Sequence, residues 1–345
     1  MFLFTRPAGR VLRLALLPVA VLFVMTACQK DNLVDSVTTE TSGLATDRQS
    51  NTIVDIALSN PDFSTLVAAV VKTNQVAFLS GTGLDATVFA PTNAAFANLP
   101  APFNNAQNIS AISDPRQINQ LRQILRYHVA LGARTASQLS NGSYPTYKNA
   151  ATPNDNVLYV GRDAAGAVFI NGNTKVVAAD VQASNGVIHV IDKVLLFPTQ
   201  DIAQIAISNG NFTALVAAVQ KTGLTNALMA PTNNFTVFAP TDAAFANLPA
   251  PLNNAANIKS ITDPATINLL RNVLQYHLIG ARVFSADLRE GISAPTLLAG
   301  NNVSITLAGG PKVKGSGNTN GSNIVATDIL ARNGVIHVID QVLLP

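Results

Sequence analysis

Four histidines are the residues of this sequence best suited to acid–base or metal chemistry, and they occur as two matched pairs. His128 and His277 each follow a tyrosine in a shared motif, whereas His189 and His337 lie in the segment NGVIHVID, which occurs unchanged at 185–192 and 333–340. Imidazole titrates near neutral pH and is a common metal ligand. Histidine is therefore the first residue type to test for a catalytic or metal-binding role.

A metal centre would have to combine His128 with His189 and take Asp180 or Asp192 as a further ligand. Transition-metal sites normally use three or four ligands, and the sequence has no HxH or HxxxH spacing to bring two histidines together. Buried histidines usually satisfy their ring nitrogens through hydrogen bonds to main-chain or hydroxyl groups. We therefore expect core histidines, with no metal and no cofactor.

Catalysis by a nucleophile or by paired carboxylates has little support in the sequence. The G-x-S-x-G elbow of hydrolases is missing, and residues 315–317 (GSG) are predicted to form a flexible loop. Glycoside hydrolysis uses two carboxyl groups, but the two glutamates are Glu290 and Glu40, and Glu40 precedes the first predicted domain. Three tyrosines could form a stacking platform for sugars, although strand packing is the commoner role: Tyr144, Tyr147 and Tyr159. We expect a protein that is not an enzyme, with an envelope enzyme acting on polysaccharide as the alternative.

The elements that carry the histidines can be predicted from local patterns. After the turn-forming pair Asn185-Gly186, side chains alternate between two faces that are both mostly apolar, and His189 lies between Val187 and Ile191. A strand that is apolar on both faces lies inside a covered sheet. We therefore expect His189 and His337 to be core residues that define the fold.

The chain contains an internal repeat. Residues 87–102 (TVFAPTNAAFANLPAP) match 236–251 at 15 of 16 positions, with Asn93 replaced by Asp242. The two copies of this segment are 149 residues apart, whereas the two copies of the octet are 148 residues apart. A single net deletion between the segment and the octet accounts for the difference. We predict two similar domains, at 51–198 and 199–345, with Thr92 and Thr241 as helix N-caps in the matched segment.

Within each copy, predicted helices precede predicted strands. Helices are expected near 51–58 and 62–73, and a longer one begins at Asp114-Pro115, an N-cap followed by a first-turn proline, and ends at His128. The second copy repeats them near 200–207 and 211–221 and from Asp263-Pro264. Short β-type runs follow, such as 157–160, 168–170 and 303–307. This order, without alternation of strand and helix, predicts the α+β class.

Three segments together resemble the fasciclin (FAS1) domain family. TVFAPTNAAF, the Tyr127-His128 pair and NGVIHVID are similar to its first conserved segment, its Tyr-His motif and its second conserved segment, and each occurs twice across about 51–345. The resemblance implies two tandem domains, each a wedge of two small β-sheets with packed helices, and extracellular adhesion or matrix-type binding. It places a candidate binding or structural motif at Tyr127-His128 and at Tyr276-His277.

The N-terminus has the features of an export signal. Three arginines precede an apolar run over 14–25, which is too short for the roughly 20 residues that span a bilayer, so residues 1–27 are predicted to be a signal peptide. Met25-Thr26-Ala27-Cys28 resembles a bacterial lipobox, which implies lipidation of Cys28, and Gln29 resembles the sorting position of lipoproteins sent to the outer membrane. Residues 28–50 would then be a lipidated N-terminus and flexible tether. We expect an exported protein anchored to the cell envelope, at the outer membrane or cell surface.

Composition narrows the class of partner. The chain has 22 Lys and Arg against 19 Asp and Glu, and three of the basic residues belong to the signal segment, so the remainder is neutral. Nucleic-acid binding needs an excess of basic residues, and we exclude it. Besides the membrane contacted through the lipid, we expect a surface protein or a polysaccharide as the ligand, with self-association as a further option. A structural scaffold without a ligand is the remaining alternative.

Overall fold

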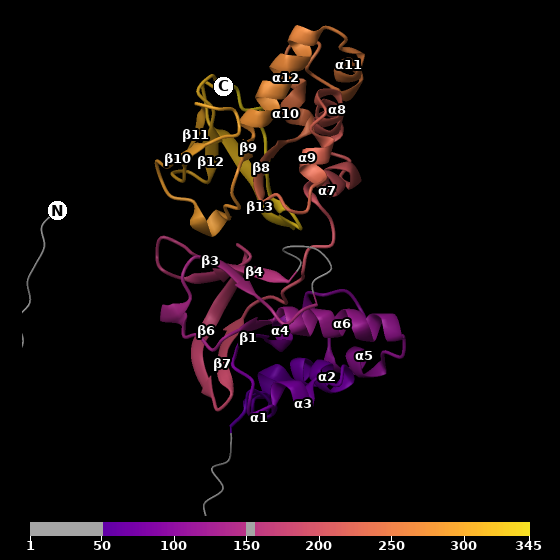
Figure 1. The fold of residues 1–345 in the computed structure, drawn as a ribbon, viewed down its shortest axis with the longest axis vertical. Coiled ribbons are helices and arrows are strands. Elements are labelled where there is room, and N and C mark those ends of the chain that lie inside the picture. The colour runs from indigo at the N-terminus through magenta and orange to yellow at the C-terminus, as the bar shows by residue number, and fades with distance from the viewer. Residues whose placement is uncertain (1–50, 150–155) are drawn as a thin grey trace, which may run out of the picture. The chain divides into compact units, whose positions relative to one another are not determined.

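A computed structural model describes residues 51–149 and 156–345. The predicted signal peptide, Cys28 and the predicted tether lie outside these residues. The part described consists of two copies of one α+β fold, called repeat 1 and repeat 2 below (Figure 1). Within the described ranges no single helix is long and apolar enough to cross a membrane; only the pair Ile53–Ser59 and Pro61–Lys72, bent by 108°, passes that test jointly, on length and composition alone.

Repeat 1 places its α-helices on one side of its strands (Figure 1). Its helices are α1 (Ile53–Ser59), η1 (Pro61–Phe63), α2 (Ser64–Lys72), α3 (Val76–Leu79), α4 (Asn93–Ala97), α5 (Ala106–Ala111), α6 (Pro115–Tyr127) and η2 (Ala136–Gln138). Its strands are β1 (Ala86–Pro91), β2 (Val129–Leu131), β3 (Gly142–Pro145), β4 (Val157–Arg162), β5 (Val168–Ile170), β6 (Thr174–Ala183) and β7 (Gly186–Ile191).

Repeat 2 reproduces this order. Its helices are α7 (Ile202–Ser208), α8 (Thr213–Thr222), α9 (Thr225–Met229), α10 (Asp242–Ala246), α11 (Ala255–Ser260), α12 (Pro264–Tyr276) and η3 (Ser285–Asp287). Its strands are β8 (Phe235–Pro240), β9 (Leu278–Ile279), β10 (Ser293–Pro295), β11 (Asn302–Thr306), β12 (Lys312–Lys314), β13 (Ser322–Ala331) and β14 (Gly334–Ile339).

The seven strands of repeat 1 pair in the order β2-β1-β7-β6-β5-β4-β3. The duplicated octet forms β7, which pairs in parallel with β1 and antiparallel with β6. The long strand β6 lies in the middle of this sheet, and its register against β7 shifts twice around Ala178; such bulges bend a strand. A bridge between Ala130 and Thr146 links the two ends, so the sheet is nearly closed. Repeat 2 has the same order.

The predicted caps are present at the helix starts. The Asp114 side chain accepts from the Arg116 N–H at the start of α6, and the Thr92 hydroxyl accepts from the Ala95 N–H at the start of α4. Strand β1 ends at Pro91, which lies opposite Ile191 of β7. A proline is tolerated at the end of a strand because it is needed there only as an acceptor.

The second predicted helix of repeat 1 is divided into η1 and α2. Phe63, at the junction, has φ −106° and ψ 12°, which is not helical. The Asn93 side chain closes the break, because its oxygen accepts from the Thr65 N–H at the start of α2 (2.9 Å) and its nitrogen donates to the Pro61 carbonyl (2.9 Å). Its counterpart Asp242 likewise accepts from the N-terminal turn of α8. The one difference in the matched segment therefore preserves this contact.

Each repeat has two apolar clusters, one on each side of its central strands. In repeat 1 the helices and β1 enclose a cluster that includes Phe96, Leu121 and Ile188. The other cluster lies among the strands and includes Phe89 and Ile191. Strand β7 therefore contributes to both clusters, which explains why its residues are apolar on both faces.

Candidate functional site

His128 lies at the C-terminal end of α6, where its ring links this helix to the segment after β7. Its Nδ1 is 2.8 Å from the Ile124 carbonyl oxygen, and its Nε2 accepts from the Leu195 N–H (2.8 Å) in the segment after β7. Because Nε2 accepts, Nδ1 carries the proton and donates to Ile124, so the ring is neutral. His128 is 3% exposed. It therefore lies in the core, away from any partner at the surface.

Burial also controls the charge of this imidazole. Loss of water around the ring lowers the pKa of His128 from 6.5 to about 4, and the hydrogen bond to Ile124 opposes this only in part. A protonated ring would point an N–H at the Leu195 N–H, which is already a donor. Its neutral form is therefore the one that fits, at neutral pH and well below it.

Repeat 2 reproduces this arrangement at His277. Its Nδ1 is 2.7 Å from the Val273 carbonyl oxygen, and its Nε2 accepts from the Leu343 N–H (2.9 Å). Burial lowers the pKa of His277 to about 4 as well. Two copies with different neighbouring side chains thus keep the same pair of main-chain contacts.

The tyrosine of the motif is directed into the strand cluster. Tyr127 is fully buried, its hydroxyl donates to the Val157 carbonyl (2.9 Å), and the Asn171 amide donates to that hydroxyl (3.1 Å). Tyr276 is also fully buried and donates to the Asn302 carbonyl (2.6 Å). The Tyr-His pair therefore ties the end of α6 or α12 to the sheet and to the segment after the last strand.

The octet histidines have the opposite proton arrangement. The Asp180 N–H donates to His189 Nδ1 (3.2 Å), so Nε2 carries the proton and donates to the Arg134 carbonyl (3.0 Å). His337 makes the equivalent contacts with the Asp328 N–H and the Val283 carbonyl. Burial lowers the pKa of both rings. These histidines hold the bulge of β6 or β13 against the segment that follows β2 or β9.

The acidic candidates for a metal site accept hydrogen bonds from main-chain N–H groups. Asp180 has φ +63° at the β6 bulge and accepts from the Ala136 N–H (2.6 Å), while Asp192 accepts from the Lys175 N–H (2.8 Å). Among the residues that the structure describes, no three His, Cys, Asp or Glu side chains come together as metal ligands. His128 and His189 are each bound to main-chain atoms and do not converge on a shared site.

The other sequence candidates are also engaged within the protein. Tyr144 and Tyr159 are buried, with the guanidinium carbons of Arg134 and Arg282 at 5.4 and 4.4 Å from their ring centroids. Tyr147 is half-buried against a phenylalanine ring, 5.2 Å between centroids. The 315–317 loop, predicted to be flexible, is held instead by Ser316 N–H to Tyr276 Oη (3.0 Å) and Gly317 N–H to the Leu344 carbonyl (3.0 Å).

One structural residue was not predicted in this role. Asn185, interpreted from sequence as part of a turn, is buried and fixes the start of α1: its oxygen accepts from the Ile53 N–H (2.9 Å), and its nitrogen donates to the Leu79 and Gly81 carbonyls (2.8 and 3.1 Å). Asn333 repeats all three contacts in repeat 2. The identity of the two octets was the available signal, but an Asn-Gly pair is also a common turn former.

Comparison with known proteins finds one family twice in the chain. A family model described as the fasciclin domain matches residues 61–197 and again 210–345. Transforming growth factor-beta-induced protein ig-h3 of Sus scrofa is 33% identical over 263 residues, which cover 75% of this chain and 34% of that protein. Protein sll1483 of Synechocystis is 44% identical over 147 residues, covering 43% of this chain and 74% of that protein. The chain thus spans about a third of the length of ig-h3.

A solved structure is also similar. It is a fasciclin domain pair from the insect cell adhesion molecule fasciclin I, with 23% sequence identity and a TM-score of 0.38. The match covers 81% of this chain and 97% of that one.

Proposed function

Because this chain belongs to the fasciclin domain family, we propose that it is a non-catalytic binding protein of cell-surface adhesion or matrix assembly, with its two domains at 51–198 and 199–345. It is anchored, in this proposal, by a lipid at Cys28 to the bacterial outer membrane or cell surface. Its ligand is a surface protein or a polysaccharide, and it acts by contact area without making or breaking a bond.

The observation that carries the proposal is the state of the histidines. All four are neutral, buried and hydrogen bonded to main-chain atoms through both ring nitrogens. A general acid or base must reach the proton that it transfers, and these rings are shut away from any substrate. In our proposal the Tyr-His pairs therefore support the fold, and the partner is bound elsewhere on the surface.

A matched strip of exposed apolar residues on β6 and on β13 is our candidate contact surface. Val177 is 55% exposed and its counterpart Val325 is 59% exposed. The alanine that follows each valine, Ala178 or Ala326, is exposed as well. Since the strip occurs in both repeats, two weak contacts on one chain would reinforce each other through effective concentration.

Binding of the purified protein to the native cell surface, measured as retained protein after washing, tests this function. We expect Val177→Glu and Val325→Glu each to weaken retention, and the double variant to weaken it by about tenfold or more, as loss of both contacts of a bivalent binder should. Leu269→Glu is the matched control. Leu269, on α12, is 52% exposed and so resembles the two valines, but it lies outside the strip and its counterpart in repeat 1 is the polar residue Gln120.

Three results would count against the proposal. Undiminished retention of a folded double variant would remove the strip as the contact surface. Turnover of a cell-envelope polysaccharide by the wild-type protein would favour the alternative, an envelope enzyme. A scaffold without a ligand would show no saturable retention at all.

A further inference from the structure

An apolar cavity of about 180 Å³ lies in repeat 1 beneath α1, α2 and α3. His128 is the one polar residue among those that line it, and no charged side chain of the described residues takes part. Both ring nitrogens of His128 are occupied by main-chain groups, so the ring has no hydrogen bond to offer a ligand. Whatever enters this cavity must therefore be uncharged and apolar.

The apolar surface continues out of the cavity. Leu58 and Val71 contribute to its lining and yet are each 61% exposed, and Val76 is 37% exposed beside them. Large apolar side chains gathered at the mouth of an apolar hollow are a common sign of a ligand or partner. A ligand that filled only the interior would leave these side chains in water.

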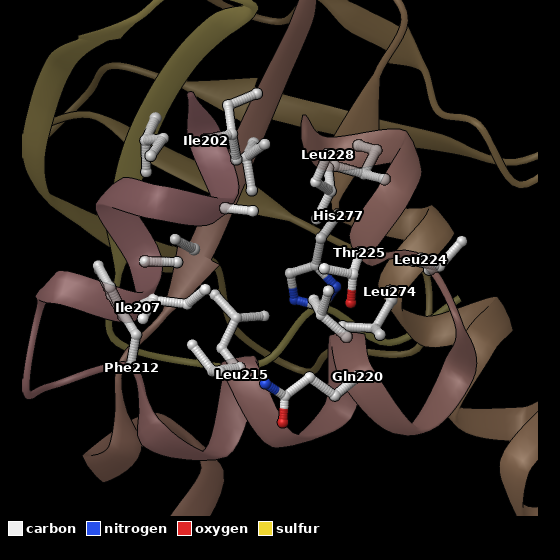
Figure 2. Close-up of a pocket in the computed structure, with 18 residues that line it drawn as sticks. Ile202, Ile207, Phe212, Leu215, Gln220, Leu224, Thr225, Leu228, Leu274 and His277 are labelled. Atoms are coloured by element: carbon white, nitrogen blue, oxygen red, sulfur yellow. The ribbon is translucent and has the colours of Figure 1, made fainter. Parts of the chain in front are cut away.

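Repeat 2 provides an internal comparison. Its equivalent cavity is only about 40 Å³ (Figure 2). Leu278 lines it where repeat 1 has the smaller Val129, and Leu224 lines it where repeat 1 has Gln75. The Gln75 side chain does not line the cavity: its oxygen accepts from Arg126 Nε (2.8 Å) and its nitrogen donates to the Asn74 carbonyl (3.0 Å).

The entrance of the cavity is also more apolar in repeat 1 than in repeat 2. The positions of Val71 and Val76 are occupied in repeat 2 by Gln220 and Thr225, both labelled among the lining residues in Figure 2. The two repeats share their fold and most of their lining. Repeat 1 thus combines the larger interior with the more apolar entrance.

We propose that the cavity of repeat 1 binds the hydrocarbon end of a fatty acyl chain. A dry apolar cavity of about 150 Å³ can hold a benzene molecule, so the interior accommodates a segment of about six carbons. The rest of the acyl chain would lie along Leu58 and Val71, and its polar head would remain in water. This site is separate from the proposed adhesive strip on β6 and β13, and its failure would leave that function intact.

Titration with cis-parinaric acid, a linear fatty acid that fluoresces in apolar surroundings, tests the site. The full chain should carry Cys28→Ser, so that no lipid of its own competes. We expect one bound probe per chain, displaced by dodecanoic acid. Val129→Leu, which installs the repeat 2 residue in the cavity, should weaken binding by about tenfold, and Val71→Gln with Val76→Thr should weaken it through the mouth.

Leu278→Val is the control, since it alters the matched position of repeat 2 and should leave the affinity of the repeat 1 site unchanged. Melting temperatures of all variants establish that they fold. Unchanged affinity in a folded Val129→Leu variant would overturn the proposal. So would saturation at no probe or at two probes, and so would displacement by toluene but not by dodecanoic acid.

Discussion

At the scale of single residues, the histidines act as neutral connectors. His128 holds its proton on Nδ1 and His189 holds its proton on Nε2, in each case because a main-chain N–H occupies the other nitrogen. One imidazole thereby satisfies a donor and an acceptor that would otherwise be buried without partners. Such groups cost about 1–3 kcal/mol each when left unpaired.

Substitution of the motif histidines should lower stability. His128→Ala leaves the Leu195 N–H and the Ile124 carbonyl without their partner and opens a cavity, so we expect a loss of about 2–4 kcal/mol in the free energy of unfolding. His277→Ala should behave alike in repeat 2. Urea denaturation measures both effects, and any loss of retention on the native cell surface should follow the fraction unfolded. A stable variant that had lost binding would instead place His128 in the binding site.

Acid should destabilise the protein in a defined window. Because the folded pKa values of His128 and His277 are about 4, below the ordinary 6.5, the unfolded chain binds more protons as the pH falls. Stability is then fully present above about pH 6.5 and declines toward pH 4, by roughly 3 kcal/mol for each ring. Asp55 and Asp263, whose pKa values lie below the ordinary 3.8, contribute to acid loss only at lower pH.

Urea midpoints at about pH 7 and about pH 4.5 measure this decline. A midpoint that stayed constant over that interval would contradict the neutral buried state of the rings.

At the scale of elements, one parallel strand pair holds each repeat together. The pair is β1 with β7 in repeat 1 and β8 with β14 in repeat 2. Strand β7 lies between β1 and β6, supplies both apolar clusters and begins beside Asn185, which binds the start of α1 and the end of α3. The approach of the strands is close at Gly186, where a Cβ atom would lie 2.3 Å from the Ala86 carbonyl oxygen. This glycine is required by space within the sheet.

Gly186→Ala should therefore be costly. The added methyl group collides with a main-chain atom that cannot rotate away, so we expect a loss of about 3 kcal/mol or more in the free energy of unfolding. Gly334→Ala, where the contact would be 2.2 Å, should cost as much in repeat 2. Gly210→Ala is the control, because no atom lies within 4 Å of its added carbon. Equal melting temperatures for Gly186→Ala and Gly210→Ala would show that the strands can separate at this point.

At the scale of the whole molecule, the sequence combines a chain that has no net charge beyond the predicted signal segment with a proposed lipid anchor. After the predicted signal segment the chain carries 19 charges of each sign, which gives it no electrostatic attraction to anionic lipids. Attachment to a membrane would then depend on acyl groups at Cys28. Two or more such chains are needed for stable anchoring.

Cys28→Ser should accordingly move the protein from the membrane fraction to the soluble fraction of its native cells. Cell fractionation followed by immunoblotting measures this, with a serine substituted for the nearby Thr26 as a conservative control. Retention of the Cys28→Ser protein in the membrane fraction would rule out the lipid anchor.

The repeat and the α+β class could be predicted from the sequence because they depend on local patterns. Periodic apolar residues, the Asp-Pro helix starts and the threonine N-caps act over a few residues, and Thr92 and Asp114 cap their helices as predicted. The division of the second predicted helix at Phe63 was not predictable, since it depends on Asn93, 30 residues away.

The candidate site was likewise predictable only in part from the sequence. Alternation along the octet was enough to predict a covered strand carrying His189, because side-chain direction follows from backbone period alone. Tertiary structure decided which main-chain atoms bind each imidazole, where its proton lies, and that Asn185 joins a strand to two helices. It also decided that the cavity of repeat 1 is larger than the equivalent cavity of repeat 2. Such a difference in volume depends on the packing of residues that lie far apart in the chain.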